Sequence, residues 1–270
     1  MNVDFKQVYV SSVLEQYFGS NFRSRWNLSA YNDSSSPSIF LGIYDDNDVG
    51  ALLKHKGPKI LIWGGADMET HKLNMVSVLQ KDTELYTWAY PGDFSSTLSL
   101  HNIRHKDIFI PLKDYSSYKP FELGNCIYVY RGIHGNRHEY FKWNEIIGPL
   151  IEKFGEDRIV FADHLPTNDL LEKIYKKCFV YVKPTPKGGC TTMFELGHMG
   201  VKTIGKGNFR LDIFKEYSDI ENLLNLIEQE SVFIGKTREI LSESLKKSLT
   251  GEEWLTLDFW RNNEHSNKSI

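Results

Sequence analysis

The regular alternation of short apolar runs with segments of helical periodicity is the feature that most constrains the fold of this chain. Strand, helix and strand follow one another at a spacing that is typical of parallel sheets, because parallel strands need a helical crossover between them. The expected strands span residues 38–44, 58–63, 85–89, 107–110, 126–130, 158–161, 179–182 and 202–204. The expected helices span residues 48–55, 69–80, 140–154, 168–178, 192–199, 220–228 and 231–249. This pattern predicts the α/β class.

A segment rich in proline, serine and tyrosine, residues 111–124, interrupts the alternation and is typical of an interdomain linker. We therefore predict two Rossmann-like, doubly wound domains, residues 1–118 and 119–250, that face each other across a cleft. The tryptophan-rich tail, residues 251–270, is expected to pack back on the body of the protein. Ligands of such sheets bind beyond the carboxyl ends of the strands, so a site is expected in the loops at those ends.

Composition excludes several classes of protein. Of the 270 residues, 41% are hydrophobic and 13% aromatic, which is enough for a sizeable core and argues against disorder. The formal net charge of -3 leaves no basic surplus to neutralise a nucleic acid. Three cysteines are too few for a disulfide framework, no apolar run reaches the roughly 20 residues of a membrane helix, and residues 1–10 lack a signal-peptide core. We expect a soluble, cytoplasmic protein with no nucleic-acid partner and no transmembrane segment.

The first unusual loop of the second half follows the strand expected at 126–130. It contains Gly132 between Arg131 and a second arginine, Arg137. Glycine lets the main chain approach a ligand closely, and the forked donors of arginine suit a phosphate group. These residues support a phosphate-binding loop and an ordinary surface loop equally well.

The second loop, residues 161–169, contains His164 and Leu165 and leads through Pro166 into a capped helix. A flat base could rest against such a turn and be contacted by main-chain amides. On local evidence, an ordinary strand-to-helix turn is the favoured interpretation.

The third loop carries the strongest signal. Gly188 and Gly189 lead directly into a helix, whose free N-terminal amides and dipole favour an anion. Glu195, one turn into that helix, is placed to accept hydrogen bonds from vicinal hydroxyls such as those of a ribose. Gly200 is expected to end the helix before the next strand.

Gly189, Thr192, Glu195 and Gly200 resemble the donor-binding motif of GT-B glycosyltransferases, in which the glutamate holds the ribose of the nucleotide. The order of the loops over residues 126–205 is similar to that of the second domain of the retaining family-four enzymes. The first half of the chain resembles these enzymes only in outline. The fold implied by the resemblance is GT-B-like, with acceptor binding in the first domain and nucleotide-sugar binding in the second.

The resemblance also implies roles for individual residues. Arg131 and Arg137 would stabilise charge on the leaving diphosphate. The loop with His164 and Leu165 would contact the base. The donor-binding residues implied are Gly132, His164, Leu165, Lys187, Gly188, Gly189, Cys190, Thr191, Thr192 and Glu195.

One position departs from the family pattern. Retaining family-four enzymes usually show Glu-x7-Glu, and the residue eight positions before Glu195 is Lys187. The first glutamate normally lies beside the donor sugar, whereas Lys187 would either counter phosphate charge or be solvated. The glycine, threonine and glutamate pattern is also similar to that of inverting GT-B enzymes that use UDP-sugars. Retaining and inverting mechanisms therefore both stay open.

In the first half, Trp63-Gly64-Gly65-Ala66-Asp67 follows an expected strand and looks like the His/Trp-Gly-Ser-Asp turn in the first domain of many sugar transferases. Asp67 is a candidate for orienting the acceptor or for taking its hydroxyl proton as general base. A helix cap for the segment that begins at Met68 is an equally supported role. His71 could serve instead, although exposed histidines are usually inert. The carboxylates of residues 45, 46 and 48 are interpreted as turn and cap residues.

No metal or other cofactor is expected. His101-x3-His105 and His134-x3-His138 have one-face spacing if helical, but neither segment has good helical character. GT-B enzymes do not generally require a metal, because side chains and helix dipoles neutralise the leaving diphosphate. Five aromatic residues are candidates for stacking on sugars, although core or linker packing is the commoner role: Tyr86, Trp88, Tyr90, Tyr115 and Tyr118.

The sequence thus predicts a metal-independent glycosyltransferase, a hexosyl- or pentosyltransferase. It would move a sugar from a UDP- or GDP-sugar to a hydroxyl of a glycan or other acceptor. Two alternatives remain: a GT-B-fold epimerase of UDP-sugars, and a catalytically silent module that binds nucleotide-sugars. Lys187 in place of the first glutamate is the best support for the silent module.

Overall fold

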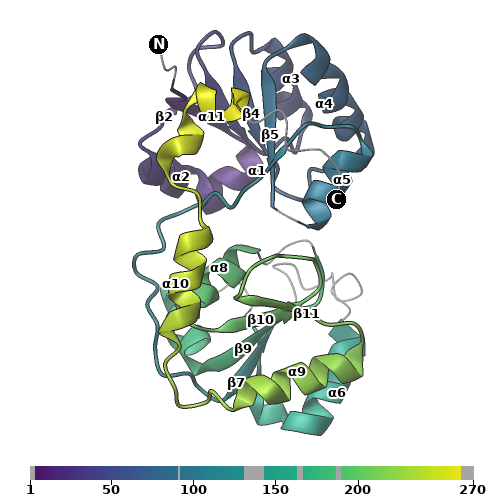
Figure 1. The fold of residues 1–270 in the computed structure, drawn as a ribbon, viewed down its shortest axis with the longest axis vertical. Coiled ribbons are helices and arrows are strands. Elements are labelled where there is room, and N and C mark those ends of the chain that lie inside the picture. Colours follow the sequence, from purple (N-terminus) through teal and green to yellow (C-terminus); the bar gives the residue numbers. More distant parts are fainter. Residues whose placement is uncertain (1–3, 91, 131–142, 163–166, 187–189, 263–270) are drawn as a thin grey trace. The chain divides into compact units, whose positions relative to one another are not determined.

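The computed structural model describes residues 4–90, 92–130, 143–162, 167–186 and 190–262. The chain forms two compact units (Figure 1). Unit 1 comprises residues 1–114 together with 249–270, and unit 2 comprises residues 115–248. Each unit contains its own parallel sheet flanked by helices.

The sheet of unit 1 has the order β2-β1-β3-β4-β5-β6, and each of its strand pairs is parallel. Its strands are β1 (Gln7–Val10), β2 (Ser29–Ala30), β3 (Ser38–Leu41), β4 (Lys59–Ile62), β5 (Leu85–Ala89) and β6 (Lys106–Asp107). Every residue of β3 and β4 is buried, as expected for central strands covered on both faces. Because the pairs are parallel, the loops that follow these strands lie along one edge of the sheet.

The helices of unit 1 connect these strands and continue in the C-terminal segment. They are α1 (Ser12–Leu14), the π-helical η1 (Glu15–Gly19), α2 (Ser20–Trp26), α3 (Asp46–Lys54), α4 (Thr70–Asp82), α5 (Asp93–Leu100), the 3-10 helix η4 (Glu252–Leu255) and α11 (Leu257–Arg261). Helix α3 begins with a capping box. The Asp45 side chain accepts a hydrogen bond from the Asp48 main-chain N–H, and the Asp48 side chain accepts one from the Asp45 main-chain N–H.

The C-terminal segment packs into unit 1 through its tryptophans. The Trp254 ring lies edge-on to that of Trp26, with 5.3 Å between ring centroids, and the Trp260 indole N–H donates to the Trp254 carbonyl. Asp4 pairs with Thr256 in an isolated antiparallel bridge. The two ends of the described chain are therefore neighbours in one unit.

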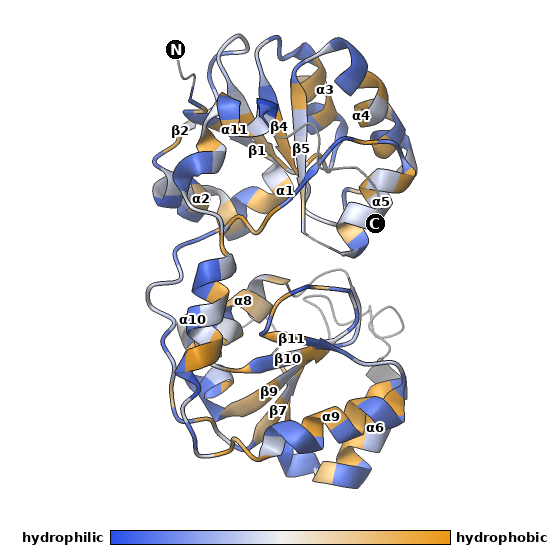
Figure 2. Cartoon of the chain, viewed as in Figure 1, coloured by the Kyte–Doolittle hydropathy of each residue, from blue (hydrophilic) through white to orange (hydrophobic). Residues whose placement is uncertain are grey.

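The sheet of unit 2 has the order β11-β10-β9-β7-β8, again with parallel pairs. Its strands are β7 (Cys126–Val129), β8 (Ile159–Val160), β9 (Cys178–Lys183), β10 (Lys202–Gly205) and β11 (Phe214–Glu216). Its helices are α6 (Trp143–Phe154), η2 (Glu156–Arg158), α7 (Thr167–Lys173), η3 (Tyr175–Lys177), α8 (Cys190–His198), α9 (Ile220–Ser231) and α10 (Glu239–Ser248). Figure 2 shows that β7 and β9 are largely hydrophobic, whereas α6 and α9 carry both hydrophobic and hydrophilic residues.

The predicted α/β class and the parallel sheets are confirmed. The strand expected at 107–110 is instead the two-residue β6, and the helix expected at 231–249 begins only at Glu239. The chain between α9 and α10 turns at Gly235, whose φ of 72° interrupts helical geometry. Strands β1, β2 and β11 and helix α5 were not expected, because their apolar patterns are short.

Gly57 provides a test of the packing around the loop at residues 34–36. A Cβ atom at this position would lie 2.8 Å from the carbonyl carbon of Ser35, whereas a Cβ on Gly50 in α3 would meet nothing within 4 Å. We expect Gly57→Ala to lower the free energy of unfolding by about 1–3 kcal/mol through overpacking. Gly50→Ala should raise it by roughly 0.5–1 kcal/mol through helix propensity. Urea denaturation gives the free energy of unfolding of both variants. If the two variants were equally stable, the close packing of Gly57 against Ser35 would be contradicted.

Candidate functional site

In unit 2, the candidate site is built around Glu195 of α8, the helix that follows β9. The Glu195 side chain is buried, with 7% of the residue exposed. Its Oε2 accepts a hydrogen bond from the Tyr175 hydroxyl at 2.6 Å, and its Oε1 accepts one from the Tyr118 hydroxyl at 3.3 Å. These two contacts orient the carboxylate group.

Tyr175 reaches Glu195 from η3, directly before β9, and is itself fully buried. Burial, and next the negative charge of Glu195, raise the pKa of the Tyr175 hydroxyl well above its ordinary value. The phenol therefore stays protonated and acts as a donor. The Thr192 side chain acts in the opposite direction and lowers the pKa of the Tyr175 hydroxyl.

Lys183 stands at the carboxyl end of β9 and is completely buried. Its Nζ donates to the carbonyls of Thr185 and Pro186, and lies 5.0 Å from the centre of the Phe209 ring. These contacts hold the segment that leads toward α8. Sequence reasoning missed Lys183, although a lysine that ends a buried run of β-branched and aromatic residues is an unusual signal.

Cys190 and Thr191 begin α8 and are half-buried. Burial raises the pKa of the Cys190 thiol, while the nearby charge of Lys183 acts in the opposite direction. Gly200 has a φ of 85° directly after α8 and ends the helix as predicted.

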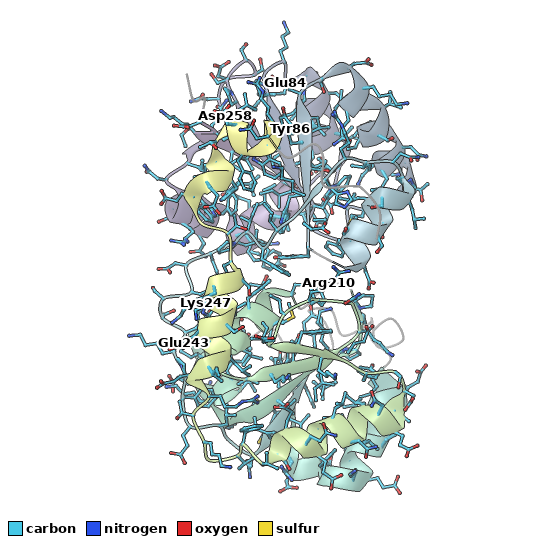
Figure 3. The ribbon with its side chains drawn as sticks, viewed as in Figure 1. Glu84, Tyr86, Arg210, Glu243, Lys247 and Asp258 are labelled. Carbon is cyan, nitrogen blue, oxygen red and sulfur yellow. The ribbon has the colours of Figure 1, made fainter. Side chains whose placement is uncertain are left out.

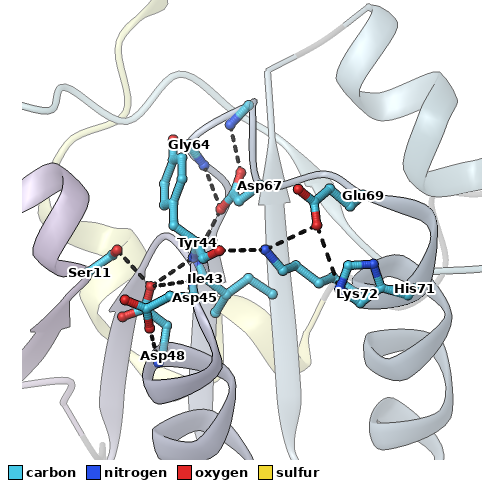
Figure 4. A network of polar contacts seen from close by, with 11 residues as sticks. Ser11, Ile43, Tyr44, Asp45, Asp48, Gly64, Asp67, Glu69, His71 and Lys72 are labelled. Carbon is cyan, nitrogen blue, oxygen red and sulfur yellow. Dashed lines mark hydrogen bonds and ion pairs between the residues drawn. The ribbon is translucent and has the colours of Figure 1, made fainter.

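In unit 1, Asp67 lies at the turn after β4 and is fully enclosed, with 0% of the residue exposed. Its Oδ2 accepts from the main-chain N–H groups of Ile43 at 3.0 Å and Gly64 at 3.2 Å, and its Oδ1 accepts from that of Gly65 at 2.8 Å (Figure 4). Burial raises the pKa of the Asp67 carboxyl, and the main-chain donors oppose that rise. Asp67 therefore ties the loop after β3 to the loop after β4.

Asp67 does not act as a helix cap in the structure. Helix α4 begins at Thr70, and its N-cap residue Glu69 makes no capping hydrogen bond through its side chain. His71 is exposed and lies 3.6 Å from the Glu69 carboxylate.

A second buried carboxylate, Asp48, holds the loop after β1. Its Oδ2 accepts from the Ser11 hydroxyl and from the Tyr44 N–H, both at 2.7 Å (Figure 4). Its Oδ1 accepts from the Tyr9 hydroxyl at 3.0 Å. Asp45 caps α3, so the interpretation of residues 45 and 48 as turn and cap residues is confirmed.

Several predicted site residues lie outside the described residues: Arg131, Gly132, Arg137, His164, Leu165, Lys187, Gly188 and Gly189. His134 and His138 of the weighed metal motif do so too. His101 instead contacts Asn74, and His105 contacts Ser95. Within the described ranges, no three His, Cys, Asp or Glu side chains are grouped so as to hold a metal ion. Nor does any helix in those ranges have the length and apolar character needed to cross a membrane.

No family model matches the chain, and no curated protein matches it. Among solved structures, it is similar to the sucrose-phosphate synthase of Thermosynechococcus elongatus, with a TM-score of 0.52 and 11% identity. The match covers 90% of this chain and 76% of the synthase. The chain has a GT-B-like fold of two Rossmann-like units.

A second similarity is to a chain in the structure of accessory secretory proteins 1, 2 and 3 from Streptococcus pneumoniae. Its TM-score is 0.45 at 14% identity. The match covers 81% of this chain and 51% of the other, so the chain spans about half the length of that relative.

The three main-chain hydrogen bonds of Asp67 lead to a stability prediction. In Asp67→Asn, the amide NH₂ replaces one acceptor oxygen and faces an N–H donor, so we expect a loss of at least about 2 kcal/mol in the free energy of unfolding. Asp46→Asn is the matched control, because Asp46 is exposed in the first turn of α3, and should change it by less than about 1 kcal/mol. Urea denaturation compares the two, and similar losses would show that the Asp67 carboxylate does not organise these loops.

The two tyrosines that contact Glu195 should differ in importance. Tyr175→Phe removes the shorter hydrogen bond and should lower the free energy of unfolding by about 1.5–3 kcal/mol. Tyr118→Phe removes the 3.3 Å contact and should cost less than about 1 kcal/mol. The same chemical change is made in both variants, so each is the control for the other in urea denaturation. A larger loss for Tyr118→Phe would contradict the observed geometry.

Proposed function

We propose that this protein is a glycosyltransferase that moves a sugar from a nucleotide-diphosphate donor, UDP- or GDP-linked, to a hydroxyl of an acceptor. The reaction breaks the bond between the anomeric carbon and the diphosphate oxygen. A new bond joins that carbon to the acceptor oxygen, and the acceptor proton passes to a base. The diphosphate leaves with the electron pair of the broken bond.

The buried Glu195 carboxylate is the observation that carries the proposal. It lies in the helix after the central strand β9 of a parallel unit, and the fold is like that of a sucrose-phosphate synthase over 90% of the chain. A carboxylate held by two tyrosines is already oriented, so it loses little entropy when it accepts hydrogen bonds from the two hydroxyls of a ribose. This supports the ribose-binding role that the resemblance implies for Glu195.

The remaining donor contacts belong to the same proposal. The main-chain amides of residues 188–192 would meet the donor phosphates at the start of α8, since a helix N-terminus favours an anion. Arg131 and Arg137 would stabilise the charge on the leaving diphosphate, which makes a metal unnecessary in this scheme. His164 and Leu165 would contact the base.

For the acceptor side, we propose that Asp67 orients the loops rather than takes the proton. Its carboxylate is enclosed and already accepts hydrogen bonds from three main-chain N–H groups, so proton transfer to it would require the turn to open. An orienting role matches the observed contacts without such a movement.

A nucleotide-binding experiment tests the donor site. We expect one of UDP, GDP, ADP or TDP, or a common sugar conjugate, to raise the midpoint of thermal unfolding. A ligand at about 100 times its Kd adds roughly 2.7 kcal/mol of stability, a shift of roughly 5–10 °C. Glu195→Gln should weaken binding about tenfold or more, because a hydrogen bond to a charged group is lost. Each variant is compared with its own ligand-free midpoint.

Glu243→Gln is the matched control, since Glu243 is exposed on α10 of the same unit (Figure 3). It should bind as the wild type does. Absence of any shift at millimolar ligand would refute the donor site. If a nucleotide binds, release of nucleoside diphosphate separates an enzyme from a silent binding module. Product analysis then separates a transferase from an epimerase.

A further inference from the structure

Tyr44 lies in the loop between β3 and α3, and both of its main-chain polar groups are held by buried side chains. Its N–H donates to Asp48 Oδ2 at 2.7 Å, and its carbonyl accepts from Lys72 Nζ at 2.7 Å (Figure 4). Asp48 is 1% exposed and Lys72 is 5% exposed. The backbone of Tyr44 is therefore fixed from two sides.

The Tyr44 ring is fixed as well, because it rests against two glycines. A Cβ atom on Gly42 would lie 2.8 Å from Tyr44 Cε2, and one on Gly64 would lie 2.9 Å from Tyr44 Cζ. Only residues without a side chain leave room for the ring at this distance. Figure 4 shows the ring standing beside Gly64 and Asp67, at the turn after β4.

The Tyr44 hydroxyl, by contrast, makes no hydrogen bond within the described part of the chain, and it is not one of the enclosed unpartnered atoms. At least part of the hydroxyl oxygen therefore reaches solvent, although Tyr44 is half-buried and its hydroxyl packs against Gly64. Burial, and next the charges of Asp67 and Asp48, raise the pKa of this hydroxyl. The group stays protonated at neutral pH and is available as a hydrogen-bond donor and acceptor.

This hydroxyl lies where a ligand of the first unit is expected. Parallel α/β sheets bind ligands beyond the carboxyl ends of their strands, and Tyr44 rests on the loops that follow β3 and β4. A rigid hydroxyl with unused hydrogen-bonding capacity costs little entropy to engage, and a polyhydroxyl compound offers matching partners. We propose that the Tyr44 hydroxyl hydrogen-bonds a hydroxyl group of the acceptor sugar, an inference that rests on the proposed glycosyl transfer.

The roles of Asp48, Asp67 and Lys72 follow from this proposal. They do not touch the sugar. They are positioning residues, because their hydrogen bonds hold the loops and the Tyr44 backbone. Gly64 contributes by lacking a side chain, because a Cβ atom there would clash with the Tyr44 ring.

The test compares Tyr44→Phe with Tyr9→Phe in the full chain. Both variants remove one phenol oxygen from the same unit. The Tyr9 hydroxyl is bonded to Asp48 at 3.0 Å, whereas that of Tyr44 has no hydrogen-bond partner among the described residues. The probes are the methyl α- and β-glycosides of glucose, galactose, mannose and N-acetylglucosamine. Their binding is titrated by saturation-transfer NMR, and the midpoint of thermal unfolding is measured for each variant.

We expect Tyr44→Phe to weaken binding of the preferred glycoside about three- to tenfold and to leave the thermal midpoint unchanged. Tyr9→Phe should lower the midpoint by about 2–4 °C, because its hydroxyl is bonded to the buried Asp48. If Tyr44 were purely structural, Tyr44→Phe would likewise lower the midpoint and would leave glycoside binding unchanged. Equal glycoside binding by wild type and Tyr44→Phe would overturn the inference, as would failure of wild type to bind any of the probes.

Donor turnover distinguishes this inference from the proposed function. Hydrolysis of the nucleotide-sugar that stabilises the wild type is measured in the wild type without acceptor, and it reports on the donor site alone. If the wild type binds glycosides through Tyr44 but turns over no nucleotide-sugar, the sugar site is supported and the proposed glycosyl transfer is refuted. If turnover is found and Tyr44→Phe transfers sugar at the wild-type rate, the glycosyl transfer is supported and the sugar contact of Tyr44 is refuted.

Discussion

Carboxyl and amino side chains are buried near the carboxyl ends of both parallel sheets, and the need to give each of them hydrogen-bond partners is the constraint on which the rest of the structure depends. A charge removed from water is costly unless every polar atom finds a partner. In unit 1, Asp67 meets this need with three main-chain N–H groups, and Lys72 meets it with a main-chain carbonyl. In unit 2, Glu195 accepts from Tyr118 and Tyr175.

These contacts give irregular loops a fixed geometry. Loops at strand ends have no ladder of hydrogen bonds to hold them, so their main-chain groups need side-chain partners. Asp48 and Asp67 supply such partners to the loops after β3 and β4, and Lys183 supplies them after β9. After β1, Asp48 binds the Ser11 hydroxyl. What remains open on this framework, above all the Tyr44 hydroxyl, is available to a ligand.

The parts of the site that could be predicted are those whose partners are close in sequence. Asp45 and Asp48 cap α3 across three residues, and an acidic pair before an apolar helix is a local signal. Gly200 ends α8 for a similarly local reason. Asp67 could be found as a candidate, but one of its donors, the Ile43 N–H, is 24 positions away. No local pattern reports such a pairing.

The sequence by itself determined the α/β class, because the spacing of buried runs and amphipathic helices sets the type of each element before any long-range contact forms. It also placed Glu195 one turn into the helix that follows β9. Only the tertiary structure decided that β1 lies between β2 and β3, that the C-terminal tryptophans belong to the unit of the first strands, and that Glu195 meets Tyr118. Strand order and the partners of buried charges depend on contacts between segments far apart in the chain. Their free energy is gained only when the whole unit closes, so no short stretch of sequence records them.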